Sequence, residues 1–468
     1  MSPVNKKYLI LIIVVAMAVT VSALTMMIPV STGSQNSTEA FNNLEGASTN
    51  SLSSSWYCFD FNGIYSQNIQ TDLLLSSFNN HVVSGNYEFY FASGNSQVTG
   101  FTLGAKSFNV TNVNSLVKNP VVAVAVNVNG GGVAVEMQVQ SANFVKYVGC
   151  SPAVSSFAIS SGGATGLGNN CDTVILNPTS QPAVVDIQVF TTSGVQYPTQ
   201  LQGLVVPANG IGIEDLSQLV PNQSIEFLRV YTPSGASDIT MSTISYTAGN
   251  VLYEPGFYEN FNRVTFAAAT NVGNQVLTLI NPTQKSVHVT INPILQGLNS
   301  VRVGETVSAG SALNISLPQL TQIPAGTNYG LRLDLKSSIF AWIYCPGPGV
   351  LDYPYPDLAS NYAIPILENN YIAGQILLDS ADNASVNFKA HLLFPFRAPL
   401  PASRATHLNG TLMSAPPIMQ VFSSSGDSSL VNFETPLALT VATKKGVIPD
   451  LIVPGASGMQ LLPVQVSS

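Results

Sequence analysis

Few residues in this chain could do chemistry, and their spacing matches no familiar catalytic arrangement. The four histidines are His81, His288, His391 and His407. None of them belongs to a zinc-protease helix motif, and the chain has no nucleophile elbow, phosphate-binding loop or EF-hand loop. His391 and His407 lie sixteen residues apart with no cysteine nearby, so we predict no metal site there. His288 alternates with valines in a predicted strand, which favours a position facing solvent or a partner.

Neighbouring carboxylates offer the only candidate acid/base pair. Glu214 and Asp215 follow Ile213 in a predicted strand. Successive strand residues lie on opposite faces of a sheet, so these two carboxylates would not face one substrate. We therefore predict no catalytic residue, no cofactor site and no metal site. A surface hydrolase is the enzymatic alternative, and the sequence favours a protein that is not an enzyme.

The four cysteines are Cys58, Cys150, Cys171 and Cys345. No two of them have the Cys-x-x-Cys spacing of zinc or thioredoxin-like sites, which argues against both kinds of site. In an exported chain they could form two disulfides, because oxidising compartments preserve such bonds. Four cysteines allow three pairings.

The composition favours a secreted or surface-exposed β protein. Charged residues make up 9% of the 468 residues, against about 25% in an ordinary soluble domain. Hydrophobic residues make up 46%, which argues against disorder. The net charge of −8 and the pI near 4.9 argue against a nucleic-acid partner, since phosphate binding requires clustered lysine and arginine.

The N-terminus contains one segment long enough to cross a membrane. Lys6 and Lys7 precede an uncharged, largely apolar run at residues 8–28, which as a helix would span about 32 Å. The two lysines predict a cytoplasmic N-terminus and an extracytoplasmic remainder. The alternative is a signal peptide cleaved after Val21-Ser22-Ala23. Residues 31–55 are rich in small polar residues and predict a flexible tether.

Beyond the tether, short β-branched runs separated by Gly, Pro, Asn and Ser predict strands and turns. A strand ending in Asn-Pro recurs at Asn177 and Asn281, with looser copies at Asn79 and Asn383. The intervals are 98, 104 and 102 residues. A period near one hundred residues fits tandem immunoglobulin-like β-sandwiches. The predicted domains are residues 1–30, 31–55, 56–150, 151–247 and 248–349, with a degenerate sandwich at 350–468.

Several of these segments resemble a family of actinobacterial envelope proteins of unknown function, DUF5719. The resemblance rests on Trp56-Tyr57-Cys58, Gly149-Cys150-Ser151-Pro152, the strand-turn segment from Asp172 to Asp186 and the segment from Gly203 to Ala208. It covers roughly residues 55–350. It implies a membrane-anchored, extracytoplasmic, sandwich-like protein with no established catalysis, often encoded beside cell-surface glycosyltransferases.

The repeat also suggests how the cysteines pair. Cys58 and Cys150 bracket the first repeat, so we predict a bridge between them, which leaves Cys171 to pair with Cys345. The predicted function is that of a membrane-anchored envelope scaffold or interaction module, held by residues 8–28, with cell-wall glycan or other envelope proteins as partners. The alternative is a carbohydrate-binding accessory protein that stacks sugars on Tyr353, Tyr355 and Tyr362.

Overall fold

The computed structural model divides the chain into two compact units, Met1–Ala40 and Phe41–Ser468. It describes residues 54–467 except 61, 66–68, 78, 106, 141–144, 152–153, 236, 248–249, 257–260, 267–274, 296–300, 318–328, 346–349, 353–358, 368–374, 380–385, 396–406, 413–418, 424–436, 456–457 and 463–464. The predicted anchor and nearly all of the predicted tether lie outside these residues. No helix within the described part is long and apolar enough to cross a membrane.

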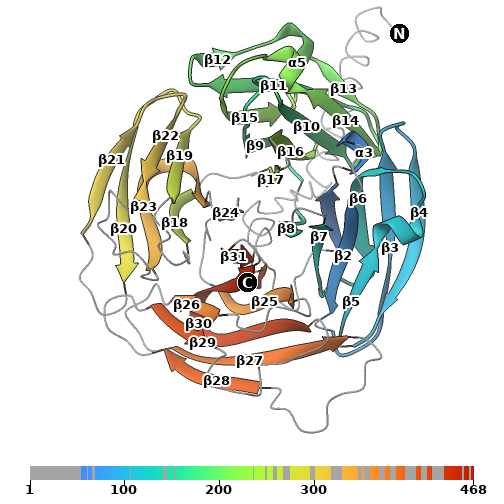
Figure 1. Cartoon of the computed structure of the whole chain (residues 1–468), viewed down its shortest axis with the longest axis vertical. Helices are drawn as coiled ribbons and strands as arrows, with labels where there is room; N and C mark the ends of the chain where they lie inside the picture. The colour runs from blue at the N-terminus through green and yellow to red at the C-terminus, as the bar shows by residue number, and fades with distance from the viewer. Residues whose placement is uncertain are drawn as a thin grey trace, which may run out of the picture. The chain divides into compact units, whose positions relative to one another are not determined.

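The described residues form an all-β structure of small antiparallel sheets, as the strand-and-turn pattern predicts (Figure 1). The first repeat contributes one four-stranded sheet and four strands of a twelve-stranded sheet, which continues into the fourth repeat where residues 394–395 pair in parallel with Ser107 and Phe108. One sheet has the order β1 (Ser55–Phe59), β6 (Val121–Val128), β3 (Val83–Phe91) and β4 (Ser96–Leu103). The other has the order β5 (Ser107–Asn112), β2 (Gln70–Ser77), β7 (Val133–Gln140) and β8 (Val145–Gly149).

The second repeat has the same strand order. Its first sheet runs β9 (Phe157–Ser161), β15 (Ile225–Tyr231), β11 (Ala183–Thr191) and then β12 (Gly194–Gln196), with β13 (Leu204–Val206) also paired to β11. Its second sheet runs β14 (Gly210–Asp215), β10 (Asn169–Asn177), β16 (Thr240–Thr247) and β17 (Asn250–Pro255). A short helix follows the corresponding strand in both repeats: α4 (Val113–Leu116) after β5 and α5 (Leu216–Leu219) after β14.

In the third and fourth repeats, one long strand serves both sheets. The third repeat comprises β18 (Phe261–Phe266), β19 (Val276–Asn281), β20 (Val287–Leu295), β21 (Val303–Val307), β22 (Ser311–Ser316), the long β23 (Tyr329–Cys345) and β24 (Val350–Asp352). The fourth comprises β25 (Ala359–Leu367), β26 (Gln375–Asp379), β27 (Val386–Pro395), β28 (His407–Leu412), β29 (Met419–Ser423), the long β30 (Leu437–Gly455), β31 (Gly458–Leu462) and β32 (Gln465–Ser467). The pairings again follow the order of the first repeat, with the long strand in the sixth and seventh positions.

The strand order differs from that of an immunoglobulin domain. In an immunoglobulin constant domain the first strand pairs with the second, and the seventh pairs with the sixth. In the first repeat, β1 pairs with β6 instead, and β7 pairs with β2 and β8. The repeats are therefore antiparallel sandwiches of a different order. Size and strand count could not reveal this, because many pairings fit one period.

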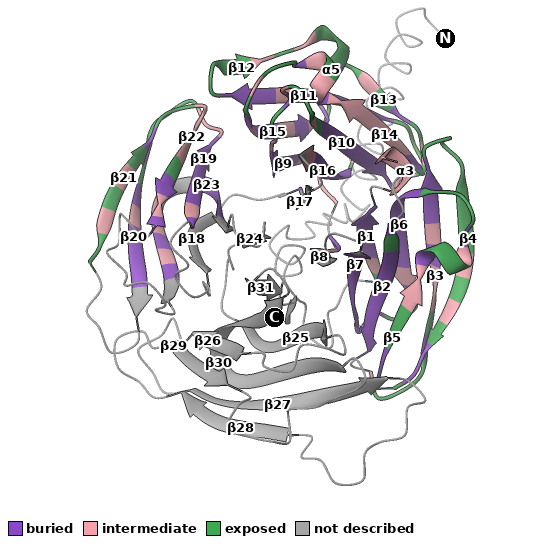
Figure 2. Cartoon of the chain, viewed as in Figure 1, coloured by how far each residue is buried: buried purple, intermediate pink, exposed green. Residues whose placement is uncertain are grey.

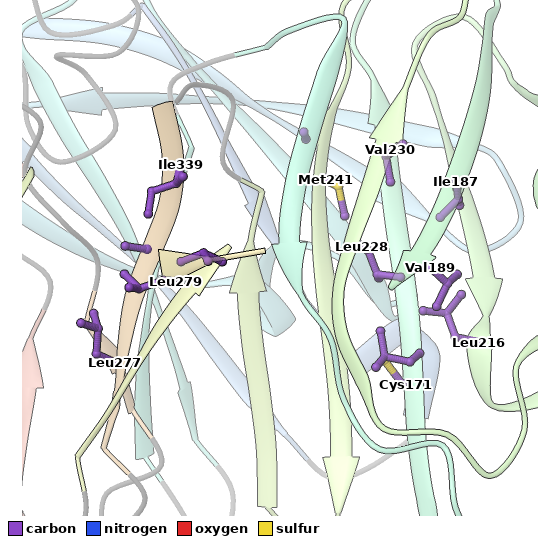
Figure 3. Close-up of a cluster of buried hydrophobic side chains, with 14 of the residues drawn as sticks. Cys171, Ile187, Val189, Leu216, Leu228, Val230, Met241, Leu277, Leu279 and Ile339 are labelled. Atoms are coloured by element: carbon purple, nitrogen blue, oxygen red, sulfur yellow. The ribbon is translucent and has the colours of Figure 1, made fainter. Parts of the chain in front are cut away.

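The first three sandwiches are held together by side chains that alternate along their strands. In the second repeat, Cys171 and Met241 on one sheet belong to the same buried cluster as Ile187, Leu228 and Val230 on the other (Figure 3). Burying such a side chain contributes about 1.5–3 kcal/mol to the free energy of unfolding. Buried residues run along the central strands, whereas the edge strands β4 and β12 are largely exposed (Figure 2).

Neighbouring repeats also share apolar clusters through their outer faces. Val174, Leu176 and Ile244 lie on the outer face of the second repeat and belong to the buried cluster of the first. A separate cluster joins residues of the second repeat to residues of the third: Ile159, Phe190, Phe227, Ile280, Phe340 and Trp342. An isolated repeat would expose these side chains to water, so each repeat gains stability from its neighbours.

The recurring asparagine is a hydrogen-bond clamp in the second and third repeats. Asn177 ends β10, and its amide nitrogen donates to the carbonyls of Gln181, Val206 and Pro207 at 2.7, 3.2 and 3.0 Å. Its amide oxygen accepts from the backbone and the hydroxyl of Thr179. Asn281 repeats this pattern with the carbonyls of Lys285, Val307 and Ser308 and with Thr283. The clamp joins two turns of the second sandwich and two turns of the third.

The first repeat lacks this clamp. The strand corresponding to β10 is β2, which ends at Ser77, so Ser77 occupies the position of Asn177. The alignment of Asn79 with Asn177 is therefore displaced by two residues. Asn79 instead donates to the carbonyls of Gly131 and Gly132 in the turn between β6 and β7. In the fourth repeat the corresponding strand, β26, ends at Asp379, and Asn383 lies outside the described residues.

Candidate functional site at the junction of the first and second repeats

A polar cluster lies where the first repeat meets the second. The short helix α3 (Asn62–Tyr65) ends in Tyr65, whose hydroxyl donates to Oδ2 of Asp172 on β10. The ring of Tyr65 also packs against that of Tyr246 on β16, with a centroid separation of 5.8 Å. Asp172 is 5% exposed. A hydrogen bond to a buried carboxylate thus joins the two repeats in addition to their apolar contacts.

A second carboxylate lies across the sheet from the first. Asp172 on β10 is the register partner of Asp215, the last residue of β14. Residues directly opposite in an antiparallel pair have Cβ atoms about 4.5–5.5 Å apart on the same face. Asp215 caps α5: its Oδ1 accepts from the backbone nitrogens of Ser217 and Gln218 at 2.9 and 3.3 Å. Its Oδ2 accepts from the side chain of Gln218 at 2.7 Å.

Burial and charge shift the titration of this cluster. Burial, aided by the charge of Asp215, raises the pKa of Asp172 to about 6, although the hydrogen bond from Tyr65 opposes the shift. Burial and the same bond to Asp172 raise the pKa of the Tyr65 phenol well above its ordinary value. The junction is therefore sensitive to protons through Asp172.

Cys171 precedes Asp172 and lies on the opposite face of β10, in the core of the second repeat with Leu216 (Figure 3). It is a free, buried thiol, so the predicted bridge between Cys171 and Cys345 is wrong. The reason is that strand alternation commits its side chain to the sandwich core. Burial raises the pKa of the thiol well above its ordinary value, with further contributions from nearby carboxylates. A neutral buried thiol is a poor nucleophile.

The predicted bridge between Cys58 and Cys150 is confirmed. Cys58 on β1 and Cys150, just after β8, form a disulfide that encloses most of the first repeat. Trp56, two residues before Cys58, is fully buried in the same cluster. The bridge therefore joins the first and last strands of the first sandwich, which belong to different sheets.

Hydrogen bonds hold both carboxylates of the junction in place. Both oxygens of Asp215 accept hydrogen bonds from α5, and Oδ2 of Asp172 accepts the bond from Tyr65. No group of three or more His, Cys, Asp or Glu residues able to hold a metal occurs in the described part of the chain.

The other residues singled out from the sequence have varied outcomes. Glu214 lies opposite Thr173 while Asp215 lies opposite Asp172, which confirms that the two carboxylates are on opposite faces. His288 is exposed, as predicted, and its Nδ1 lies 3.3 Å from the hydroxyl of Thr306. Tyr353 and Tyr355 lie outside the described residues, and Tyr362 lies on β25, where only the backbone is described.

Two residues that sequence reasoning separated are brought together. His391 on β27 is the register partner of His407 on β28. Their separation of sixteen residues in the sequence argued against a shared site. Two paired strands can nevertheless bring such residues opposite one another, because the loop between the strands can have any length. The alternation of polar with apolar or glycine residues at 386–391 and at 407–412 was the available signal. The junction at Tyr65 and Asp172 was also missed, because no local pattern links the two.

Comparison of the sequence with protein families and with characterised proteins, and of the structure with solved structures, found no match to this chain. The function therefore has to be argued from the repeated antiparallel sheets and from the junction.

Proposed function

We propose that the chain is a membrane-anchored, extracytoplasmic protein of the cell envelope that acts as a structural scaffold or interaction module. The observation that carries this proposal is which partners the buried polar groups bind by hydrogen bonds. Tyr65 and Asp172 join two repeats, and Asn177 and Asn281 each fasten two turns of one sandwich. Polar groups used in this way fasten turns within a sandwich and join one repeat to the next, as a scaffold requires.

The disulfide supports an extracytoplasmic location. Bonds such as Cys58–Cys150 persist in oxidising compartments and are rare where glutathione keeps thiols reduced. Residues 8–28 would hold the chain in the membrane, with Lys6 and Lys7 on the cytoplasmic side. The sandwich repeats resemble immunoglobulin-like domains in size and in their two-sheet build, though not in strand order.

The segments predicted to resemble the DUF5719 envelope proteins would fit the same setting, although no family model matches the chain. The partners we propose are cell-wall glycan or other envelope proteins, which are the large surfaces present outside a membrane. A scaffold needs exposed edges and faces for such contacts, and the edge strand β4 is largely exposed.

Fractionation of cells expressing the full-length chain tests the location. We expect the protein in the membrane fraction, and protease added outside should remove everything beyond the tether. A variant in which Ile12 and Val15 are both changed to Arg should leave the membrane, because charges at the centre of the span oppose insertion. A mature protein that begins at Leu24 and appears in the medium would contradict the anchor.

Cross-linking on intact cells tests the scaffold role. Envelope proteins cross-linked to the wild-type chain should be recovered reproducibly, and co-sedimentation with purified cell wall should be insensitive to soluble sugars. Binding to one polysaccharide that a soluble sugar displaces would instead indicate the carbohydrate-binding alternative. Turnover of a cell-wall substrate by the purified chain would contradict both.

A further inference from the structure

Strand β4 forms an open edge of the first repeat. Its sheet has the order β1, β6, β3 and β4, so β4 pairs with β3 on one side only. The ladder runs without a register shift from Tyr90 opposite Ser96 to Val83 opposite Leu103. No other strand in the described part of the chain pairs with β4, and most of its residues are exposed, Val98 by 60% (Figure 2). Such an edge presents unpaired N–H and C=O groups to a further strand.

The other edge strands of the first three repeats have features that oppose such pairing. Strands β14, β17 and β21 contain carboxylates, and β12 has only three residues. Strands β1 and β9 are mostly buried, and β22, with six residues, is half-buried along most of its length. Proteins block open edges by charge, shortness, proline, bulges or covering. With eight residues and none of these features, β4 is the longest uncharged edge strand in the described part of the chain.

Alternate residues of β4 direct their backbone groups to the open side. The backbone nitrogen of Phe91 donates to the carbonyl of Asn95 at 3.1 Å, which makes these two residues a hydrogen-bonded pair. Hydrogen-bonded and non-hydrogen-bonded pairs alternate along an antiparallel ladder. The residues of β4 that form the non-hydrogen-bonded pairs with β3 therefore have outward N–H and C=O groups: Ser96, Val98, Gly100 and Thr102.

The strand is complementary to a second copy of itself. Antiparallel pairing about a two-fold axis at Thr99 places Ser96 opposite Thr102 of the other copy and Val98 opposite Gly100 of the other copy. This register gives every outward-directed residue of β4 a partner, whereas any displaced register leaves at least one without. Because β4 carries no charge, no like charges meet across the axis. The exposed side chain of Val98 then lies over a glycine, which has no side chain to obstruct it.

We propose that the chain associates with a second copy of itself by antiparallel pairing of the two β4 strands. The pairing joins two four-stranded sheets into one continuous sheet and satisfies the outward backbone groups of both edges. One strand pair is a small interface, so we expect a reversible dimer with a dissociation constant of roughly 1–100 µM. The inference goes beyond the partners proposed above, because it holds whether or not the chain also contacts cell wall or other envelope proteins.

Disulfide trapping of the full-length chain in isolated membranes tests the pairing. Thr99 lies opposite its own counterpart, and the Cα atoms of such a pair are about 4.5 Å apart, within the range that a disulfide bridges. Thr99→Cys should therefore form a disulfide-linked dimer under mild oxidation. Thr102→Cys is the matched control on the same strand, because its counterpart lies about 20 Å away along the ladder. It should form little dimer, and the wild-type chain, whose free Cys171 is buried, should form none.

Three results of this trapping would overturn the proposal. They are the absence of a Thr99→Cys dimer, equal cross-linking of Thr99→Cys and Thr102→Cys, and capture of a different protein by Thr99→Cys in place of a second copy.

Sedimentation equilibrium of the full-length chain in detergent measures what the edge contributes. Val98→Pro removes an outward N–H that β3 does not use, so the β-type circular dichroism spectrum should be kept. The dissociation constant of the dimer should rise roughly 10-fold or more, since the change occurs on both sides of the axis. Val98→Thr keeps the N–H and should dimerise like the parent chain. An unchanged dissociation constant in Val98→Pro, or a parent chain that stays monomeric throughout the range of roughly 1–100 µM, would show that β4 does not pair with a second copy.

Discussion

The first and second repeats share one strand order but are fastened in different ways. In the first, a disulfide joins Cys58 near its start to Cys150 near its end, and Ser77 ends the second strand with a hydroxyl that has no hydrogen-bond partner among the described residues. In the second, the cysteine Cys171 is free, and Asn177 ends the corresponding strand with a full set of hydrogen bonds. The same strand order is therefore stabilised in two different ways, by a disulfide in the first repeat and by the hydrogen bonds of a buried asparagine amide in the second.

The largest expected effect is the loss of the disulfide. Replacing Cys150 by Ser should lower the free energy of unfolding of the first repeat by about 4–5 kcal/mol, because the bridge spans 92 residues and restricts the unfolded chain. Trp56 and Trp342 are the only tryptophans, so fluorescence of a Trp342→Phe chain reports the first repeat alone. Urea denaturation of that chain with and without the bridge gives the change.

Cys171→Ala is the matched control for the disulfide. It removes a cysteine from the second repeat, so the unfolding of the first repeat should keep its midpoint. Equal midpoints for Cys150→Ser and the parent chain would mean that the bridge does not stabilise the first sandwich.

The next effect is the loss of the asparagine clamp. Asn177→Ala should cost about 3 kcal/mol, because several buried backbone groups lose their hydrogen-bond partner at once. Hydrogen exchange measured by mass spectrometry should show faster exchange in the turns around Thr179 and Asn209. Asn281→Ala should do the same in the third repeat. Asn79→Ala, which removes two bonds at a half-buried site, should cost about 1 kcal/mol.

If Asn79→Ala destabilised the chain as much as Asn177→Ala, the two asparagines would be equivalent after all, and the assignment of Ser77 to the clamp position would be contradicted.

The third effect depends on pH and concerns the junction between the two repeats. Asp172 has a pKa of about 6 in the folded chain and about 3.9 when unfolded. The folded state binds the proton more tightly, so the free energy of unfolding should fall as pH rises from about 4 to about 6, by up to about 3 kcal/mol. Above about pH 6 the folded state no longer gains stability from a proton on Asp172. Asp172→Asn should flatten this part of the profile in urea denaturations between pH 4 and pH 7.

The amide that Asp172→Asn introduces would keep an oxygen that accepts from Tyr65, so a changed slope would report the charge rather than the hydrogen bond. An unchanged slope in Asp172→Asn would show that Asp172 does not titrate in this window.

The smallest effect concerns the turn that the clamp secures. Asn209 has a φ of 45°, and Gly310 holds the corresponding place in the third repeat with a φ of 58°. Their backbone nitrogens donate to the carbonyls of Thr179 and Thr283. Asn209→Ala should cost about 1 kcal/mol, since most side chains disfavour this left-handed conformation. Asn209→Gly should stay within about 0.5 kcal/mol of the parent chain in thermal denaturation.

Part of the site could be predicted from local pattern. The alternation of Ile213, Glu214 and Asp215 predicts opposite faces for the two carboxylates, because a strand has a period of two. The bridge from Cys58 to Cys150 followed from their positions at the ends of one repeat. The contact between Tyr65 and Asp172 spans 107 residues, and no period or motif connects an α3 residue with a β10 residue.

The sequence by itself determined that the chain is built of strands and turns, that a unit of about one hundred residues recurs, and that one bridge spans the first unit. These properties follow from side-chain shape, proline and spacing, which act over a few residues or through simple repetition. Only the tertiary structure decided that the first strand pairs with the sixth, that Cys171 lies in a core, and that His391 lies opposite His407. Such pairings depend on which distant faces bury the most apolar surface together, and that choice is made by the whole chain.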